Sequence, residues 1–217
     1  MFSLNDDNIL DYLDQITTPP DDWVNKLEAE AEENHVPIMD RQGILLLQQL
    51  IRLHQADKIL EIGTAIGYSA LRMLEAKPDT KIISVERNNE MYQRAMHNIN
   101  TQNKQEHIDV IFGDALEVED LIHDKGPYDL IFIDAAKGQY RHFFEKYQTY
   151  LTDSGCIVTD NVLFRGLVVN PNYAPKRLQN LAKKIDHYNQ WLMEHPDYHT
   201  TILPVGDGVA ISLKKKK

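Results

Sequence analysis

Three oxygen-bearing side chains follow two Ile- and Val-rich segments in a pattern suited to holding a metal ion. Asp134 ends the segment YDLIFID, Asp160 ends the segment GCIVTD, and Asn161 comes next. If these segments are neighbouring parallel strands, their carboxyl ends meet at one edge of a sheet and the three side chains converge. Two carboxylates and an amide oxygen, without Cys or His, suit a hard cation such as Mg²⁺ or Mn²⁺. Taken alone, the Asp-Asn pair would be an ordinary turn.

A lysine lies close to this group. Lys137 comes three residues after Asp134, and a lysine whose pKa is depressed by a neighbouring cation can accept the proton of a substrate hydroxyl. The alternative is a surface lysine at the start of a helix, but the N-terminus of a helix disfavours a positive charge. We therefore predict Lys137 and Asp134 as the catalytic residues.

A glycine-containing turn follows another apolar segment and suits a nucleotide-like ligand. The stretch EIGTAIGYS contains Gly63 and Gly67, which allow a tight turn with the backbone close to a ligand before a helix begins near Tyr68. It is not a GxGxxG motif, which weakens a dinucleotide interpretation. Without further signals, a turn that binds nothing is an equal alternative.

Acidic residues at the next two segment ends strengthen the ligand-binding interpretation. Glu86 ends KIISVE some 20 residues later, where a carboxylate can bind both hydroxyls of a ribose. Asp114, between Gly113 and Ala115, is placed to meet an adenine. Each acid alone is most often a solvated loop residue, but acids in register at successive strand ends indicate a binding site.

The elements that position these residues alternate between apolar strands and amphipathic helices. Strands that are apolar throughout indicate a sheet covered on both faces, and the strand-helix-strand order indicates parallel pairing. The predicted strands cover residues 58–63, 81–86, 107–113, 128–134, 155–160, 200–205 and 208–214. A helix is predicted from about Pro175 to Glu194, and the last two strands are close enough for an antiparallel hairpin. The sequence thus predicts a doubly wound α/β fold of seven strands.

The first 55 residues are predicted to be helical. Apolar residues at helical spacing indicate helices around residues 9–16, over 23–34 and from Asp40 onward. We expect one domain over residues 1–217, with a helical N-terminal segment over 1–55 and an α/β core over 56–217.

Composition excludes several classes of protein. The chain has 217 residues and a formal net charge of −10, so general nucleic-acid binding is not expected, although a local basic patch is compatible with this charge. No apolar run is long enough to span a membrane, and we expect a cytoplasmic protein with no membrane partner. Cys156 is the only cysteine, which excludes an intramolecular disulfide and a Cys-based zinc site.

The motifs together resemble those of the cation-dependent S-adenosylmethionine O-methyltransferases, which include catechol and caffeoyl-CoA methyltransferases. EIGTAIGYSA is similar to their first motif, and residues 36–39 are similar to their cofactor-lid element. The resemblance implies a class I methyltransferase (Rossmann-like) fold, in which Met39 and Ser69 contact the methionine part of the cofactor. The full set expected to bind S-adenosylmethionine is Met39, Glu61, Gly63, Gly67, Ser69, Glu86, Gly113, Asp114, Ala115 and Asp134. The same resemblance implies a substrate with two vicinal oxygens, held at a cation bound by Asp134, Asp160 and Asn161.

Longer stretches resemble the bacterial tRNA 5-hydroxyuridine methyltransferases, which make 5-methoxyuridine at wobble position 34. These include ILEIGTAIGYSA, FIDAAKGQY, TDNVLF and WLMEHPDY. The resemblance implies an anticodon loop carrying 5-hydroxyuridine as the partner. A catechol-like or caffeoyl-CoA-like small molecule stays open, because it offers the same pair of adjacent oxygens.

The residues give weaker support for RNA. The basic residues placed to contact it are Arg165, Lys176, Arg177, Lys183 and Lys184, although, from the residues alone, a solvated helix face is the favoured explanation of the last four. Tyr188, Trp191 and Tyr198 are candidates for stacking on an extruded base, while helical spacing favours the core for Tyr188.

The last expectations concern the oligomeric state and two alternative classes of protein. Members of the resembled group commonly use N-terminal helices in homodimers, so a homodimer is expected. A nicotinamide oxidoreductase and a non-enzymatic nucleotide-binding module stay open as alternatives. The first lacks the third glycine of its motif, and the second leaves the three oxygen ligands without a role.

Overall fold

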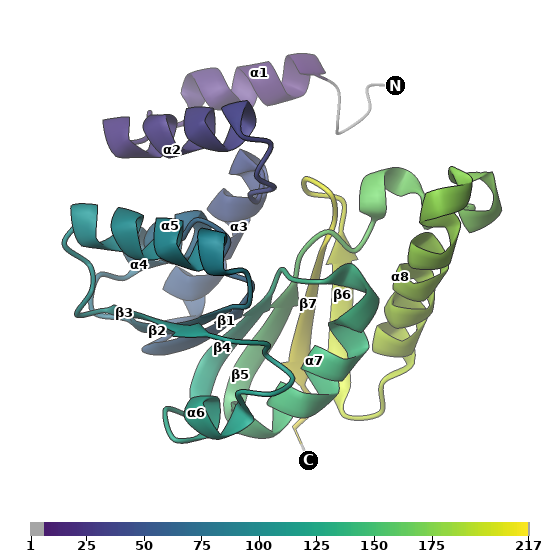
Figure 1. The fold of residues 1–217 in the computed structure, drawn as a ribbon. Coiled ribbons are helices and arrows are strands. Elements are labelled where there is room, and N and C mark those ends of the chain that lie inside the picture. The colour runs from purple at the N-terminus through teal and green to yellow at the C-terminus, as the bar shows by residue number, and fades with distance from the viewer. Residues whose placement is uncertain (1–6, 217) are drawn as a thin grey trace. The chain divides into compact units, whose positions relative to one another are not determined.

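The computed structural model describes residues 7–216 (Figure 1). The chain divides into two compact units, residues 1–38 and 39–217. The described part of the first unit contains helices α1 (Asp7–Ile16) and α2 (Asp22–Glu33). Helix α2 buries Val24, Leu27 and Ala31, which recur at helical spacing. The two helices predicted before residue 35 are therefore confirmed.

Within residues 39–216 the strands form one seven-stranded sheet in the order β3-β2-β1-β4-β5-β7-β6. Strands β1 to β5 pair in parallel, whereas β7 lies antiparallel between β5 and β6. The strands are β1 (Lys58–Ile62), β2 (Lys81–Glu86), β3 (Ile108–Phe112), β4 (Tyr128–Ile133), β5 (Leu151–Thr159), β6 (Tyr198–Leu203) and β7 (Val209–Lys214). This is the predicted sheet, including its C-terminal antiparallel hairpin.

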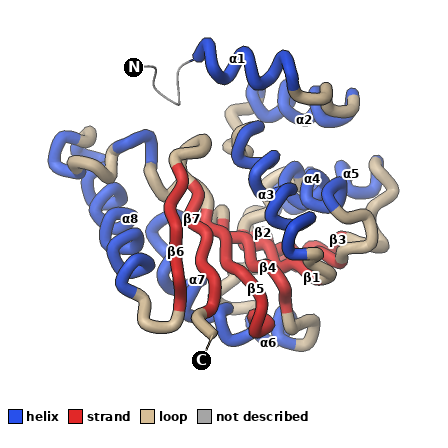
Figure 2. Tube along the Cα trace, turned by 180° about the vertical axis from the view of Figure 1, so that it is seen from behind, coloured by secondary structure: helices blue, strands red, loops and turns tan. Residues whose placement is uncertain are grey.

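Helices cover both faces of the sheet, as Figures 1 and 2 show from opposite sides. One face carries α3 (Arg41–His54), α4 (Tyr68–Ala76) and α5 (Asn89–Thr101). The other carries α6 (Glu119–His123), α7 (Tyr140–Tyr147) and α8 (Lys176–Glu194). Single 3₁₀ turns are η1 (Lys137–Gln139), η2 (Gln148–Tyr150), η3 (Phe164–Gly166) and η4 (Pro171–Tyr173).

Short polar side chains determine where two of these helices begin. The Asp40 carboxylate accepts a hydrogen bond from the Gly43 N–H at 2.9 Å and caps α3. The Asn88 side chain accepts from the N–H groups of Glu90 and Met91 and caps α5. Each side chain satisfies backbone donors that have no partner within the helix.

Strand β5 begins four residues earlier than the apolar pattern predicts. Leu151 pairs with Tyr128 of β4, and a register shift separates this pair from the regular ladder that starts at Leu130 and Cys156. Residues 152–154 are partly or fully exposed and polar. An apolar pattern therefore does not identify this first part of β5 as a strand.

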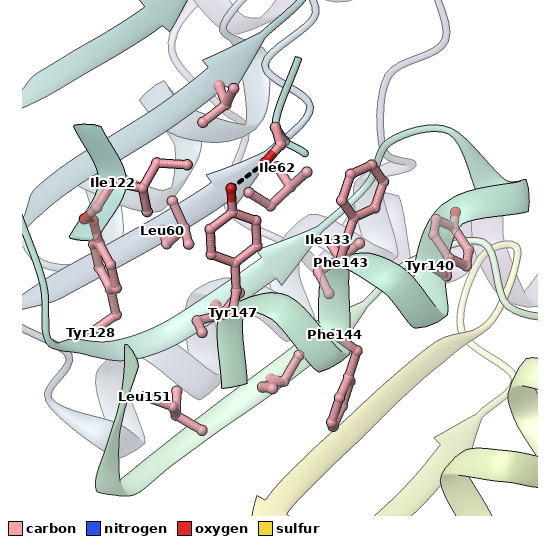
Figure 3. Packing of buried hydrophobic residues seen from close by; sticks show 14 of the residues in the cluster. Leu60, Ile62, Ile122, Tyr128, Ile133, Tyr140, Phe143, Phe144, Tyr147 and Leu151 are labelled. Carbon is pink, nitrogen blue, oxygen red and sulfur yellow. Dashed lines mark hydrogen bonds between the residues drawn. The ribbon is translucent and has the colours of Figure 1, made fainter. Parts of the chain in front are cut away.

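One large core cluster lies between the sheet and helices α6, α7 and α8 (Figure 3). The hydroxyl groups of its buried tyrosines donate to backbone carbonyls: Tyr147 to Ala115, and Tyr128 to Ile122 at 2.7 Å. Buried Phe144 meets the rings of Trp191 and Tyr198 edge-on, at centroid distances of 5.1 and 5.0 Å. Aromatic rings therefore fasten α7 and α8 to the sheet.

This packing bears on the three aromatic residues considered for base stacking. Tyr188 and Tyr198 are each only 3% exposed, and Tyr188 also shares a hydrogen bond with the Thr159 hydroxyl at 2.9 Å. The core position favoured for Tyr188 is therefore confirmed, whereas the expectation that Tyr198 stacks on an extruded base is wrong, because other core side chains already cover its ring. Trp191 is half-buried, with the Arg141 guanidinium 4.9 Å from its ring centroid.

Two expectations from composition can be compared with the described residues. Between residues 7 and 216, no helix combines the length and the apolar character that crossing a bilayer requires. Cys156 is buried in β5, and burial raises the pKa of its thiol to about 12, so it acts as a small core residue.

Replacing Phe144 with alanine should strongly destabilise the fold. Phe144→Ala removes a fully buried ring that joins α7 to α8 and β6, so we expect the free energy of unfolding to fall by about 3–5 kcal/mol. Urea denaturation measures this loss. Phe112→Ala is the matched control, because Phe112 is 50% exposed and its truncation should cost much less. Equal losses in the two variants would contradict the assignment of Phe144 to the core.

Candidate functional site

The carboxyl ends of β4 and β5 bring the three predicted metal ligands together. Backbone hydrogen bonds extend the ladder past both strands: Asp134 N–H donates to Ile62 C=O, and Asp160 N–H to Ile133 C=O, each at 3.0 Å. The Asn161 amide nitrogen donates to one oxygen of Asp134 at 3.0 Å and to one oxygen of Asp160 at 2.8 Å. The convergence expected from the spacing is therefore present.

The two carboxylates form an environment that favours a cation. Burial, together with the neighbouring Asp134 charge, raises the pKa of Asp160 to about 8. Burial also raises the pKa of Asp134, against the opposing effects of Lys137 and Asn161. The second Asp160 oxygen, Oδ1, is buried and has no hydrogen-bond partner. An unpartnered carboxylate oxygen beside a second carboxylate is a suitable ligand for a hard cation.

The site has a limited set of protein ligands. Among residues 7–216, no group of three His, Cys, Asp or Glu side chains is arranged to hold a metal ion. The candidate site instead combines two carboxylates with the Asn161 carboxamide, whose nitrogen faces the carboxylates here. Turning the carboxamide over would present its oxygen to a cation. Such a set leaves coordination positions for substrate or water, as is common for Mg²⁺.

Lys137 lies at the same edge, at the start of η1. Burial lowers the pKa of Lys137, while the negative charges of Asp134, Asp160 and Asp207 oppose this effect and the charge of Arg165 adds to it. A lowered pKa increases the fraction of neutral amine at neutral pH, which is the form that accepts a proton.

The turn after β1 is fixed by close backbone contacts. Gly63 has a φ of +101°, and a Cβ on it would lie 2.1 Å from the Asp134 carbonyl oxygen. Gly67, with a φ of +82°, precedes α4, which begins at Tyr68 as predicted. Gly63 therefore lets the predicted cofactor loop pass directly against the residue that begins the metal site.

Below this loop, Glu61 is fully buried. Its two carboxylate oxygens accept hydrogen bonds from the hydroxyls of Ser69 and Ser84. Burial nevertheless raises the pKa of Glu61 to about 7. Ser69, predicted to contact the methionine part of a cofactor, is buried and in this structure donates to Glu61.

The acids predicted to bind a nucleoside lie at the ends of β2 and β3. Glu86 is half-buried and accepts the Ala65 N–H at 2.9 Å and the Asn88 N–H at 2.7 Å. Gly113 donates its N–H to the Glu86 carbonyl at 2.9 Å, which places the Gly113 turn beside β2. The backbone thus orients the Glu86 carboxylate while each oxygen keeps a lone pair for a ligand.

The two residues after Gly113 have partners within the protein. One oxygen of Asp114 accepts the Leu116 N–H at 2.9 Å, and the other lies 3.5 Å from an Arg87 nitrogen. Ala115 is buried, and its carbonyl accepts from Tyr147. The expected adenine contact of Asp114 and Ala115 stays a prediction.

Met39 lies beside the first turn of α3. It is 3% exposed, and a Cβ on Gly43 would lie 2.9 Å from the Met39 methyl group. The neighbouring Asp40 charge raises the pKa of Asp160. The start of α3 therefore contributes to the electrostatics of the metal site, which the sequence pattern did not reveal.

The predicted basic residues occupy different places. Arg165 is exposed in η3 and acts electrostatically on Lys137. On α8, Lys184 reaches η1, because its Nζ lies 3.7 Å from the position of a Cβ on Gly138. The other three, Lys176, Arg177 and Lys183, lie exposed on α8. Arg165 and Lys184 thus add positive charge near Lys137 and η1, and we call this pair the basic rim.

Two residues near the site were not singled out from the sequence. The Tyr140 hydroxyl donates to the Asp160 carbonyl at 2.9 Å and holds the end of β5. Asp207, in the turn between β6 and β7, accepts the Arg165 N–H. The sequence placed Asp207 only in the short connection between the last two predicted strands, within the stretch PVGDG.

The sheet order and the acidic strand ends define a class I methyltransferase fold, and similar solved structures share it. The family model for O-methyltransferases matches residues 15–215. The chain therefore belongs to the O-methyltransferase family.

Individual relatives agree with this membership. The caffeoyl-CoA O-methyltransferase of Medicago sativa is 34% identical over 182 residues, which cover 78% of this chain and 72% of the relative. A crystal structure of a candidate caffeoyl-CoA O-methyltransferase from Staphylococcus aureus is 38% identical, with a TM-score of 0.89 over 98% of this chain and 100% of that one. The SAH-bound methyltransferase PaMTH1 of Podospora anserina is 25% identical, with a TM-score of 0.85 over 100% and 99%.

Glu61→Gln should reduce the pH dependence of stability. The pKa of Glu61 is raised from 4.5 to about 7, so the folded state binds this proton more tightly than the unfolded chain. The resulting stabilisation is complete below pH 4.5 and is lost as the pH rises through about 7, by up to about 3 kcal/mol. Urea denaturation near pH 5 and near pH 8 measures the loss in the wild type and its reduction in the variant.

Glu117→Gln provides the control for this comparison. Glu117 is exposed, so its replacement should leave the pH dependence as in the wild type. If Glu61→Gln also keeps the wild-type pH dependence, ionisation of Glu61 is not its source.

Proposed function

We propose that this O-methyltransferase transfers the methyl group of S-adenosylmethionine to a hydroxyl that has a second oxygen beside it, with the help of Mg²⁺ or Mn²⁺. The observation that carries the proposal is the convergence of Asp134, Asp160 and Asn161, with an unpartnered buried oxygen, next to Lys137. A nicotinamide oxidoreductase or a binding module gives these residues no common role.

The residues at the ends of β1, β2 and β3 would hold the methyl donor. Glu86 is oriented by backbone N–H groups to accept the ribose hydroxyls, and the Gly63 turn brings the backbone close to the ligand. Glu61 carries a buried carboxyl whose raised pKa a ligand ammonium group would lower again. SAH in PaMTH1 and the family membership support this assignment.

On the acceptor side, Asp134, Asp160 and Asn161 would hold the cation. A bound divalent cation lowers the pKa of a hydroxyl that it contacts and orients the neighbouring oxygens. Lys137 Nζ then accepts the hydroxyl proton, because burial favours its neutral form. The deprotonated oxygen attacks the sulfonium methyl group; the O–CH₃ bond forms as the S–CH₃ bond breaks, and S-adenosylhomocysteine leaves as a neutral thioether. Correct alignment of oxygen and methyl group supplies much of the rate.

Lys137→Ala should lower kcat while leaving cofactor affinity unchanged. Loss of a positioned general base typically slows the reaction about 10²- to 10⁴-fold, whereas Lys137 is not among the residues assigned to the donor. Steady-state kinetics and calorimetry with S-adenosylmethionine measure the two quantities. Lys104→Ala, which changes an exposed lysine, should match the wild type. A variant at position 137 with wild-type kcat would remove Lys137 from the mechanism.

The comparisons favour a small acceptor with a catechol-type pair of oxygens. The Medicago sativa and Staphylococcus aureus proteins are both described as caffeoyl-CoA O-methyltransferases, the latter as a candidate. A catechol offers the two adjacent oxygens that the cation site requires.

The second candidate acceptor is 5-hydroxyuridine at the wobble position of tRNA. The specific observation in its favour is the basic rim formed by Arg165 and Lys184 beside Lys137, which suits the phosphates that flank a nucleotide. The resemblance of several long stretches to tRNA 5-hydroxyuridine methyltransferases supports it as well. The anticodon loop as a partner and the homodimer stay predictions.

Methyl transfer from labelled S-adenosylmethionine tests the proposal and separates the acceptors. The purified enzyme is given either tRNA containing 5-hydroxyuridine or a simple catechol, each with Mg²⁺ and with EDTA. We expect label only with Mg²⁺. Transfer to the catechol alone assigns the small acceptor, and transfer to tRNA assigns the RNA. Equal transfer in EDTA would overturn the role of the cation.

A variant of Lys184 tests whether the basic rim contacts the phosphates of tRNA. If tRNA is methylated, Lys184→Ala should raise its KM and reduce the salt dependence, because fewer phosphates are neutralised. Lys104→Ala, which changes an exposed lysine outside the predicted RNA contacts, is the comparison, and methylation of the catechol should change with neither variant.

A further inference from the structure

The turn between β6 and β7, residues 205–208, lies against the segment that carries two of the metal ligands. We call this segment, residues 160–166, the metal loop. Val162 N–H donates to Gly208 C=O at 3.0 Å, and Leu163 N–H donates to Asp207 C=O at 2.8 Å. The Asp207 carboxylate accepts from Arg165 N–H. Three successive contacts therefore join the turn to the metal loop.

The metal loop adopts a backbone conformation that needs support. Asn161, Phe164 and Arg165 have φ values of +62°, +48° and +55°. Asn tolerates this left-handed region, but Phe and Arg adopt it only at a cost in free energy. The Asp207 carboxylate binds the backbone of one of the two strained residues. The hydrogen bond from Asp207 is thus made to a residue whose left-handed backbone conformation costs free energy.

The turn is also fixed on its other side. A Cβ on Gly208 would lie 2.3 Å from the Leu163 side chain, and a Cβ on Gly206 would lie 1.6 Å from an Asp40 carboxylate oxygen. Asp40 in turn caps α3. The turn is therefore packed between the start of α3 and the metal loop. These contacts restrict the position of Asp207.

Other groups hold the beginning of the metal loop. Tyr140 donates to the Asp160 carbonyl at 2.9 Å, and Asn189 donates to the Val162 carbonyl at 2.7 Å. Asp207 acts at the end of the loop, where Arg165 is exposed beside Lys137. Its contribution is thus distinct from that of Tyr140 and Asn189.

We propose that Asp207 is a positioning residue: by accepting the Arg165 N–H it keeps the end of the metal loop in its left-handed conformation and presents Arg165 at the acceptor side of the site. What matters in this role is a hydrogen-bond acceptor on a short side chain, not the negative charge.

Hydrogen–deuterium exchange over residues 161–168 tests the proposal without any turnover. Asp207→Ala removes the acceptor, so we expect exchange of this segment to accelerate about tenfold. Asp207→Asn keeps an acceptor oxygen at the same position and should exchange as the wild type does. Asp153→Ala, which changes an exposed residue at the opposite end of β5, should also match the wild type.

Two exchange results would overturn the proposal. The first is wild-type exchange in Asp207→Ala. The second is acceleration in Asp207→Asn as large as in Asp207→Ala, which would assign the effect to charge. If Asp207→Ala does not fold, Asp207→Asn still decides, because accelerated exchange in that variant contradicts the proposal and wild-type exchange supports it.

Kinetics provide a second readout, which rests on the proposed function. With the acceptor identified by the labelling experiment, Asp207→Ala should raise its KM about tenfold, and Asp207→Asn should restore it. The affinity for S-adenosylmethionine, measured by calorimetry, should stay within about twofold of wild type in both. Because exchange requires no acceptor, failure of the proposed function leaves that test intact.

Discussion

The repulsion between two carboxylates at adjacent strand ends is the constraint on which the site depends. The parallel ladder places Asp134 and Asp160 side by side in a poorly hydrated position; burial raises the pKa of both, and the Asp134 charge contributes to the raised pKa of Asp160. Such an arrangement is costly for the apoprotein. The surrounding structure stabilises it with the Asn161 amide, the Lys137 charge and the backbone hydrogen bonds that continue β4 and β5.

The parallel pairing of β1 with β4 explains why the donor and acceptor sides of the site meet. Gly63 and Asp134 directly follow the neighbouring strands β1 and β4, and the absence of a side chain on Gly63 lets the two backbones touch. The turn assigned to the cofactor and the first metal ligand are therefore parts of one rigid unit. A methyl group and an attacking oxygen can be aligned without a large rearrangement of either loop, which is favourable for a displacement reaction.

Much of this architecture could be predicted from the sequence, because buried parallel strands are apolar throughout and their last residues are polar. The order of residues placed Asp134, Asp160 and Asn161 at adjacent strand ends, and the structure brings their side chains within hydrogen-bond distance there. The polar start of β5 was missed because residues 152–154 are partly or fully exposed. The burial of Tyr198 beneath Phe144 and the reach of Lys184 to η1 depend on how α7 and α8 pack. Local patterns do not encode that packing.

The antiparallel direction of β7 has a consequence for how the metal loop is supported. Because β7 runs opposite to β5, the turn that precedes it returns to the edge where the parallel strands end. The contact at the end of the metal loop therefore joins residues that are 42 positions apart in the sequence. A substitution in the β6–β7 hairpin can thus alter the metal loop without touching any residue near it in the sequence.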